Sequence, residues 1–186
     1  GPAVMRIFWC LSVASILSRG DAQESLADLP LFRDGCQALA DERFETAVTR
    51  FRECWDLIRE GDSAGPEANF VAARLLEAMV RDGIAAEAVE WVGANESFQP
   101  DAATSYWIAA AFQSEERFAE AADHYQLYLS STADPDQATV INHAVCLARG
   151  GEAGAAHDRV SDLVPSGPDE AFRLALIAAS ASRQCA

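Results

Sequence analysis

A triplet of side chains recurs four times in this chain, in the order apolar, alanine, apolar, with gaps of three and four residues. The four central alanines lie 41, 33 and 35 residues apart. The triplets are Phe44, Ala47 and Phe51; Ala85, Ala88 and Val92; Phe118, Ala121 and Tyr125; and Ala153, Ala156 and Val160. Residues three and four apart share one face of a helix. An internal period of this length is typical of stacked supersecondary units.

Each triplet is preceded by a second helical pattern. A compact or apolar residue stands twelve positions before each central alanine, and another apolar residue follows three positions later. These residues are Gly35 and Ala38, Leu76 and Met79, Ala109 and Phe112, and Ala144 and Leu147. Polar or glycine-containing breaks separate them from the triplets, at 40–43, 81–83, 113–116 and 149–151. The pattern predicts four antiparallel helix pairs that approach closely where the side chains are small.

Composition agrees with a helical protein. Half of the 186 residues are apolar, and no run alternates Val, Ile or Thr in the manner of a strand. We therefore expect an all-α fold, an α-solenoid of stacked antiparallel helix pairs over residues 28–186, preceded by an apolar N-terminal segment, 1–27. Residues 169–182 predict a C-terminal capping helix, or the first helix of a further repeat. Its apolar face is formed by Phe172, Ala175, Leu176 and Ala179.

The spacing resembles that of the tetratricopeptide repeat (TPR) family, a helix–turn–helix of about 34 residues. The resemblance covers roughly residues 28–168. The helix-pair alanine of the family matches the four central alanines, and its second-helix aromatic residue matches Phe51 and Tyr125. Its closing proline matches Pro100 and Pro168, whereas its first-helix tryptophan is absent.

In that family the first helices line an inner face that receives peptides. The resemblance implies that the groove of this chain is formed by Phe32, Leu39, Phe70, Ala73, Val80, Tyr106, Ala110, Ile141, Asn142 and Val145. Some members grip a terminal carboxylate with lysines and asparagines. Here only Asn142 has a matching type, so the face suits an apolar or amphipathic segment instead. The alternative, that these side chains only pack between repeats or against the chain's own ends, stays open.

Residues 1–27 allow two interpretations. Arg6 precedes an apolar run at 7–17, and Gly20 and Ala22 follow at the spacing of an export cleavage site, as in a signal peptide. An amphipathic helix packed on the solenoid is the other interpretation. Its apolar stripe would be Val4, Ile7, Phe8, Leu11 and Ala14. The run is shorter than the roughly 20 residues of a bilayer span, so we expect no transmembrane segment. The signal-peptide interpretation favours an exported or periplasmic location over the cytoplasm.

Charge and motif content exclude several function classes. The chain has 14 basic and 29 acidic residues, and a net charge of −15 repels nucleic acid and anionic membranes. It has no glycine-rich phosphate loop, no HExxH and no GxSxG, and its five cysteines lack metal-ligand spacing. His124, His143 and His157 have no candidate acid or base partner. We expect no enzyme, no cofactor and no metal site.

Protein binding is the function class that remains. We expect a non-catalytic scaffold that binds an apolar or amphipathic peptide segment of a protein partner. Two alternatives stay open: a small secretion-type TPR chaperone, and a structural or self-associating repeat module of a longer envelope protein. Homo-oligomerisation, or docking of the N-terminal segment on the solenoid, are further alternatives for the apolar surface.

Overall fold

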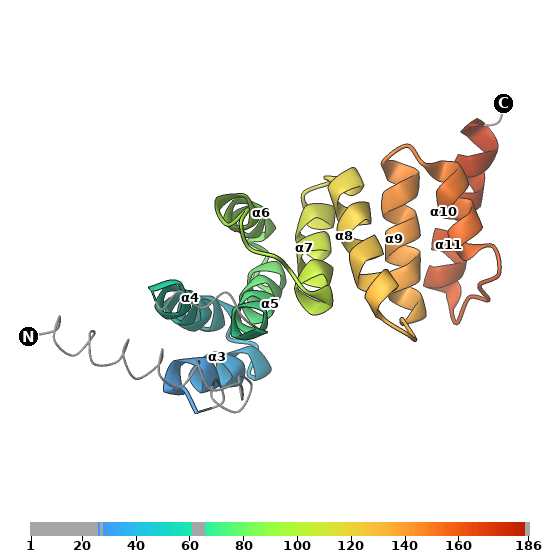
Figure 1. Ribbon diagram of the computed structural model, residues 1–186. Coiled ribbons are helices and arrows are strands. Elements are labelled where there is room, and N and C mark those ends of the chain that lie inside the picture. Colours follow the sequence, from blue (N-terminus) through green and yellow to red (C-terminus); the bar gives the residue numbers. More distant parts are fainter. Residues whose placement is uncertain (1–25, 27, 61–65, 185–186) are drawn as a thin grey trace, which may run out of the picture. The chain divides into compact units, whose positions relative to one another are not determined.

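The computed structural model describes residue 26, residues 28–60 and residues 66–184. These residues form helices joined by turns and short loops, and they include no strand (Figure 1). The prediction of an all-α fold is therefore confirmed. The two interpretations of the N-terminal segment, signal peptide and packed helix, concern residues that lie almost entirely outside the described ranges. The exception is Leu26, which is buried.

The helices fall into two compact units, divided between Pro100 and Asp101. The first unit contains α3 (Pro30–Ala40), α4 (Phe44–Glu60), α5 (Pro66–Arg81) and α6 (Ala85–Ala94). The second contains α7 (Ala102–Ser114), α8 (Phe118–Ser131), α9 (Gln137–Arg149), α10 (Ala153–Val160) and α11 (Pro168–Gln184). Within each unit, helices that follow one another in the chain pack together. The stretch expected to form one domain, 28–186, spans both units.

One turn joins the two helices of each pair, and it occurs four times. Its central residue has a positive φ: 58° at Glu42, 79° at Gly83, 58° at Glu116 and 99° at Gly151. The next backbone amide donates to a carbonyl five residues earlier: Arg43 to Ala38 at 2.8 Å, Ile84 to Met79 at 3.0 Å, Arg117 to Phe112 at 2.9 Å and Glu152 to Leu147 at 2.8 Å. This is the Schellman arrangement that ends a helix with a left-handed residue. The breaks predicted from the sequence are four copies of one backbone motif.

The central alanines of the triplets lie inside the helix pairs. All four are fully buried: Ala47, Ala88, Ala121 and Ala156. In the first pair the helices are in close contact at Gly35 of α3, where an added Cβ would lie 2.8 Å from Cε1 of Phe51. Phe51 is itself fully buried, and its ring packs edge-on against Phe32, with centroids 5.7 Å apart. Compact residues thus stand where the sequence predicted close helix contact.

Aromatic rings pack together where α4 meets α6 in the first unit. Trp55 of α4 packs edge-on against Trp91 of α6 at 4.8 Å and against Phe98 at 5.4 Å between centroids. An ion pair between Arg52 and Glu87, 2.7 Å long, joins the same two helices at the surface. Because Phe98 lies beyond the end of α6, the cluster holds the segment that follows the second helix pair.

The second unit ends in α11, which packs on both α9 and α10. Its inner face contributes Ile177 to a buried cluster that also contains Ala144, Ala156 and Val160. The helix predicted over 169–182 is therefore present. Its buried face contains Ile177, whereas the predicted apolar face is exposed: Phe172, Ala175, Leu176 and Ala179.

Candidate functional site

The ten residues predicted to line a groove lie on the first helices of the four pairs. In the first unit they are Phe32 and Leu39 on α3, and Phe70, Ala73 and Val80 on α5. In the second unit they are Tyr106 and Ala110 on α7, and Ile141, Asn142 and Val145 on α9. The residues thus form two sets, one in each unit.

The first set divides between a buried and an accessible helix face. Phe32 and Leu39 of α3 are buried and offer a ligand little surface. On α5, Ala73 and Val80 are half-buried and Phe70 is 37 % exposed. Among the described residues of the first unit, Phe70 is the one large apolar side chain that is exposed. The accessible apolar surface of this set therefore centres on α5.

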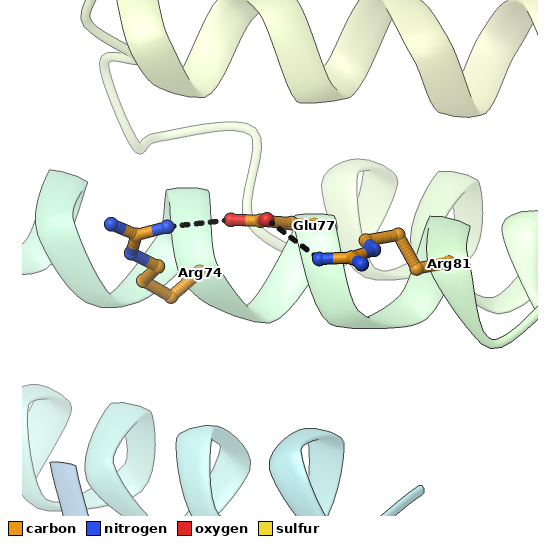
Figure 2. Close-up of polar contacts among 3 residues, drawn as sticks. All are labelled: Arg74, Glu77 and Arg81. Atoms are coloured by element: carbon orange, nitrogen blue, oxygen red, sulfur yellow. Dashed lines mark hydrogen bonds and ion pairs between the residues drawn. The ribbon is translucent and has the colours of Figure 1, made fainter. Parts of the chain in front are cut away.

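Three charged side chains on α5 form what we term the ion-pair row: Arg74, Glu77 and Arg81 (Figure 2). Arg74 Nη1 donates to Glu77 Oε2 at 2.7 Å, and Arg81 Nη1 donates to Glu77 Oε1 at 3.4 Å. The Glu77 side chain is only 12 % exposed, whereas those of Arg74 and Arg81 are 45 % and 38 % exposed. The carboxylate is thus held between two cations, as a buried charge requires. Each guanidinium has five N–H groups, and among the described residues each donates one hydrogen bond, to Glu77.

The Phe44 ring of α4 supports one end of the ion-pair row. The Arg81 guanidinium lies over the Phe44 ring of α4, 4.7 Å from its centroid. Burial raises the pKa of the Cys36 thiol on α3; the positive charge of Arg74 opposes this rise and the negative charge of Glu77 adds to it. This arrangement was not predicted from the sequence. The available signal was the R-x-x-E-x-x-x-R spacing, since residues three and four apart are neighbours on a helix.

Tyr106 in the second unit belongs to an aromatic cluster. Its ring centroid lies 5.0 Å from that of Trp107, 5.9 Å from that of Tyr125 and 5.3 Å from that of Tyr128. Tyr125 is buried, and its hydroxyl donates to Gln113 Oε1 at 2.8 Å. The half-buried Tyr106 therefore helps to pack α7 on α8, and Ala110, one turn further along α7, is also half-buried.

The three predicted residues on α9 take part in contacts within the second unit. Ile141 is fully buried. The amide oxygen of Asn142 accepts a hydrogen bond from Arg173 of α11. Val145 packs against the cluster that contains Ile177. Asn142 was the one residue of the type that grips a carboxylate; its oxygen accepts from the chain's own last helix, whereas a carboxylate would accept from its amide N–H2 group.

Three kinds of reference were compared with the chain: protein-family models, curated proteins and solved structures. None of them matches it. The α5 face, with the exposed Phe70, is the most accessible part of the predicted groove.

His143 is buried and His124 is half-buried. Burial lowers the pKa of His143 to about 4, with a further contribution from Arg159. His124 stacks on Phe112 with centroids 5.6 Å apart, and burial lowers its pKa as well. In the described ranges no group of three His, Cys, Asp or Glu residues is placed to hold a metal ion. Of the helices described, none has the length and apolar character needed to cross a membrane.

Proposed function

We propose that this chain is a non-catalytic protein-interaction scaffold of the TPR type. Its helix pairs would stack as an α-solenoid, and its first helices would bind an apolar or amphipathic segment of a protein partner. Support comes from the fourfold repetition of one helix–turn–helix, with a buried alanine at the equivalent position of each copy. Repeats of this kind bury their core between neighbouring units and leave an extended surface for ligands.

The observation that carries the proposal is the combination of Phe70 with the ion-pair row. Phe70, Arg74, Glu77 and Arg81 are spaced by four, three and four residues and so share one stripe of α5. Covering the exposed part of the Phe70 ring contributes roughly 1 kcal/mol. A hydrogen bond from a guanidinium to a ligand acceptor contributes roughly 1.5–3 kcal/mol. A segment that carries an apolar side chain next to a hydrogen-bond acceptor could cover the Phe70 ring and accept a hydrogen bond from a guanidinium at the same time.

The charge of the ion-pair row favours such a segment. Two arginines and one glutamate give the ion-pair row a net charge of +1, in a chain whose total is −15. Glu77 holds both guanidinium groups in position, so less side-chain freedom is lost when a ligand binds. The individual contributions are small and ordering the segment opposes them, so we expect micromolar, exchangeable binding.

Selection from a library of displayed random peptides tests the proposal on the full chain. The affinity of the selected peptides is then measured by fluorescence anisotropy with wild type, Phe70→Ala and Leu127→Ala. Leu127 is the matched control, because it is an exposed apolar side chain on a second helix, α8. We expect Phe70→Ala to weaken binding about fivefold and Leu127→Ala to leave it unchanged. Equal affinity of Phe70→Ala and wild type would contradict the proposed site.

A further inference from the structure

The outer face of α11 is an apolar stripe that no described part of the second unit covers. Phe172 is 65 % exposed and Leu176 is 50 % exposed, and Ala175 and Ala179 beside them are also exposed. The inner face of the same helix is occupied, because Ile177 is buried in the cluster with α9 and α10. Two large apolar side chains one turn apart on a helix form a patch rather than an isolated exposed residue.

Opposite charges mark the two ends of this stripe. Asp169 lies one turn before Phe172, and Arg183 lies one turn after Ala179. The spacings of three, four, three and four residues from 169 to 183 place both charges on the same face as the apolar side chains. Both charged residues are exposed. Along the helix the stripe is therefore first acidic, then apolar and then basic.

This order makes the stripe complementary to itself in the antiparallel direction. We propose that α11 docks against α11 of a second copy of the chain, antiparallel, about a twofold axis at Leu176. Asp169 of each copy then lies opposite Arg183 of the other, and Phe172 of each lies opposite Ala179 of the other. A large side chain thus faces a small one at both ends of the apolar seam. A twofold interface requires self-complementarity of this kind, since one patch must serve both copies.

Charge and size together predict a weak dimer. Each copy carries a net charge of −15, which opposes association over the whole surface. One face of a 17-residue helix from each copy buries less than the roughly 1,200 Å² typical of stable interfaces. Association therefore depends on the few contacts of the seam, and single substitutions there have large effects.

Sedimentation velocity of the full chain over a range of concentrations reaching high micromolar tests the interface. Wild type is expected to pass from monomer to dimer, and Phe172→Glu is expected to weaken association at least ~10-fold while circular dichroism shows unchanged helix content. Leu127→Glu is the matched control, because it adds the same charge at an exposed leucine on α8. It is expected to dimerise like wild type. A wild type that stays monomeric, or a Phe172→Glu variant that dimerises as well as Leu127→Glu, would overturn the proposal.

Charge exchange tests the antiparallel direction. Arg183→Glu alone places Glu opposite Asp169 and is expected to weaken the dimer, and Asp169→Arg alone is expected to do the same. An equimolar mixture of the two variants restores both opposite-charge pairs, and so does the double variant. Recovery in the mixture and in the double variant supports the antiparallel seam. Single variants that dimerise as wild type does would overturn it.

Discussion

Replacing Gly35 by alanine tests the close approach of α3 and α4. The new Cβ would lie 2.8 Å from Cε1 of Phe51, and 3.0 Å from two further atoms of the same ring. The ring has little freedom to move, because Phe51 is fully buried and Phe32 packs on it edge-on. Overpacking of this kind costs about 1–3 kcal/mol, whereas alanine in place of glycine in a helix gains up to about 1 kcal/mol. We expect a net loss of about 1–2 kcal/mol.

Gly93→Ala is the matched control for this substitution. Gly93 also lies in a helix of the first unit, but nothing is found within 4 Å of its added Cβ. The control should therefore gain up to about 1 kcal/mol from helix propensity alone. Urea unfolding followed by circular dichroism gives both values. A second variant, Gly35→Ala with Phe51→Leu, should lose less than the sum of the two single losses, because the shorter side chain relieves the clash.

The result that would refute this reasoning is a gain in stability. If Gly35→Ala and Gly93→Ala were equally stabilising, the Phe51 ring would not lie against α3 at Gly35. Additive losses in the double variant would carry the same meaning, since independent sites add.

Three further predictions concern the turns, the ion-pair row and His143. Glu42→Gly and Glu116→Gly should each raise the free energy of unfolding by about 0.5–1 kcal/mol, because glycine relieves the left-handed strain at φ 58°; a loss in urea unfolding would contradict the turn geometry. Glu77→Gln should lower the free energy of unfolding by about 1 kcal/mol, because two half-exposed guanidinium groups lose a buried partner. An unchanged free energy of unfolding would show that the ion pairs contribute nothing to stability. Burial lowers the pKa of His143 to about 4. As the pH falls from about 6.5 to about 4, this imidazole is therefore protonated in the unfolded chain before it is protonated in the folded one, which removes up to about 3 kcal/mol from the free energy of unfolding. The stability of wild type relative to His143→Gln should fall by that amount across this pH range, and a constant difference would contradict the burial of a neutral imidazole.

The helix pairs were predictable because their signal is local. Periodicity places an alanine on the same face as apolar residues three and four positions away, and the breaks lie where polar residues or glycine interrupt it. The helices end and begin at those breaks, as at Ala40 and Phe44 or at Arg149 and Ala153. The left-handed residue of the turn could be predicted from the sequence only where it is a glycine. Gly83 and Gly151 indicate it, whereas Glu42 occupies the same position without any sequence signal.

The candidate site was less predictable because it depends on distant neighbours. Asn142 was expected on an open face, but Arg173, 31 residues away, bonds to it from α11. Phe32 was expected to line the groove, yet its burial follows from contact with Phe51 of the next helix. Periodicity identifies a stripe on a helix but does not say whether solvent or another helix covers it.

The central claim is that one helix–turn–helix unit is built four times in this chain. Native-state hydrogen exchange of four backbone amides, followed residue by residue by NMR, tests it most directly. The amides are those of Arg43, Ile84, Arg117 and Glu152, each of which donates to a carbonyl five residues earlier. We predict that all four amides are protected from exchange, and more strongly than the neighbouring exposed amides. Exchange at the rate of an unstructured chain at any one of them, while the flanking helices stay protected, would contradict the fourfold repeat.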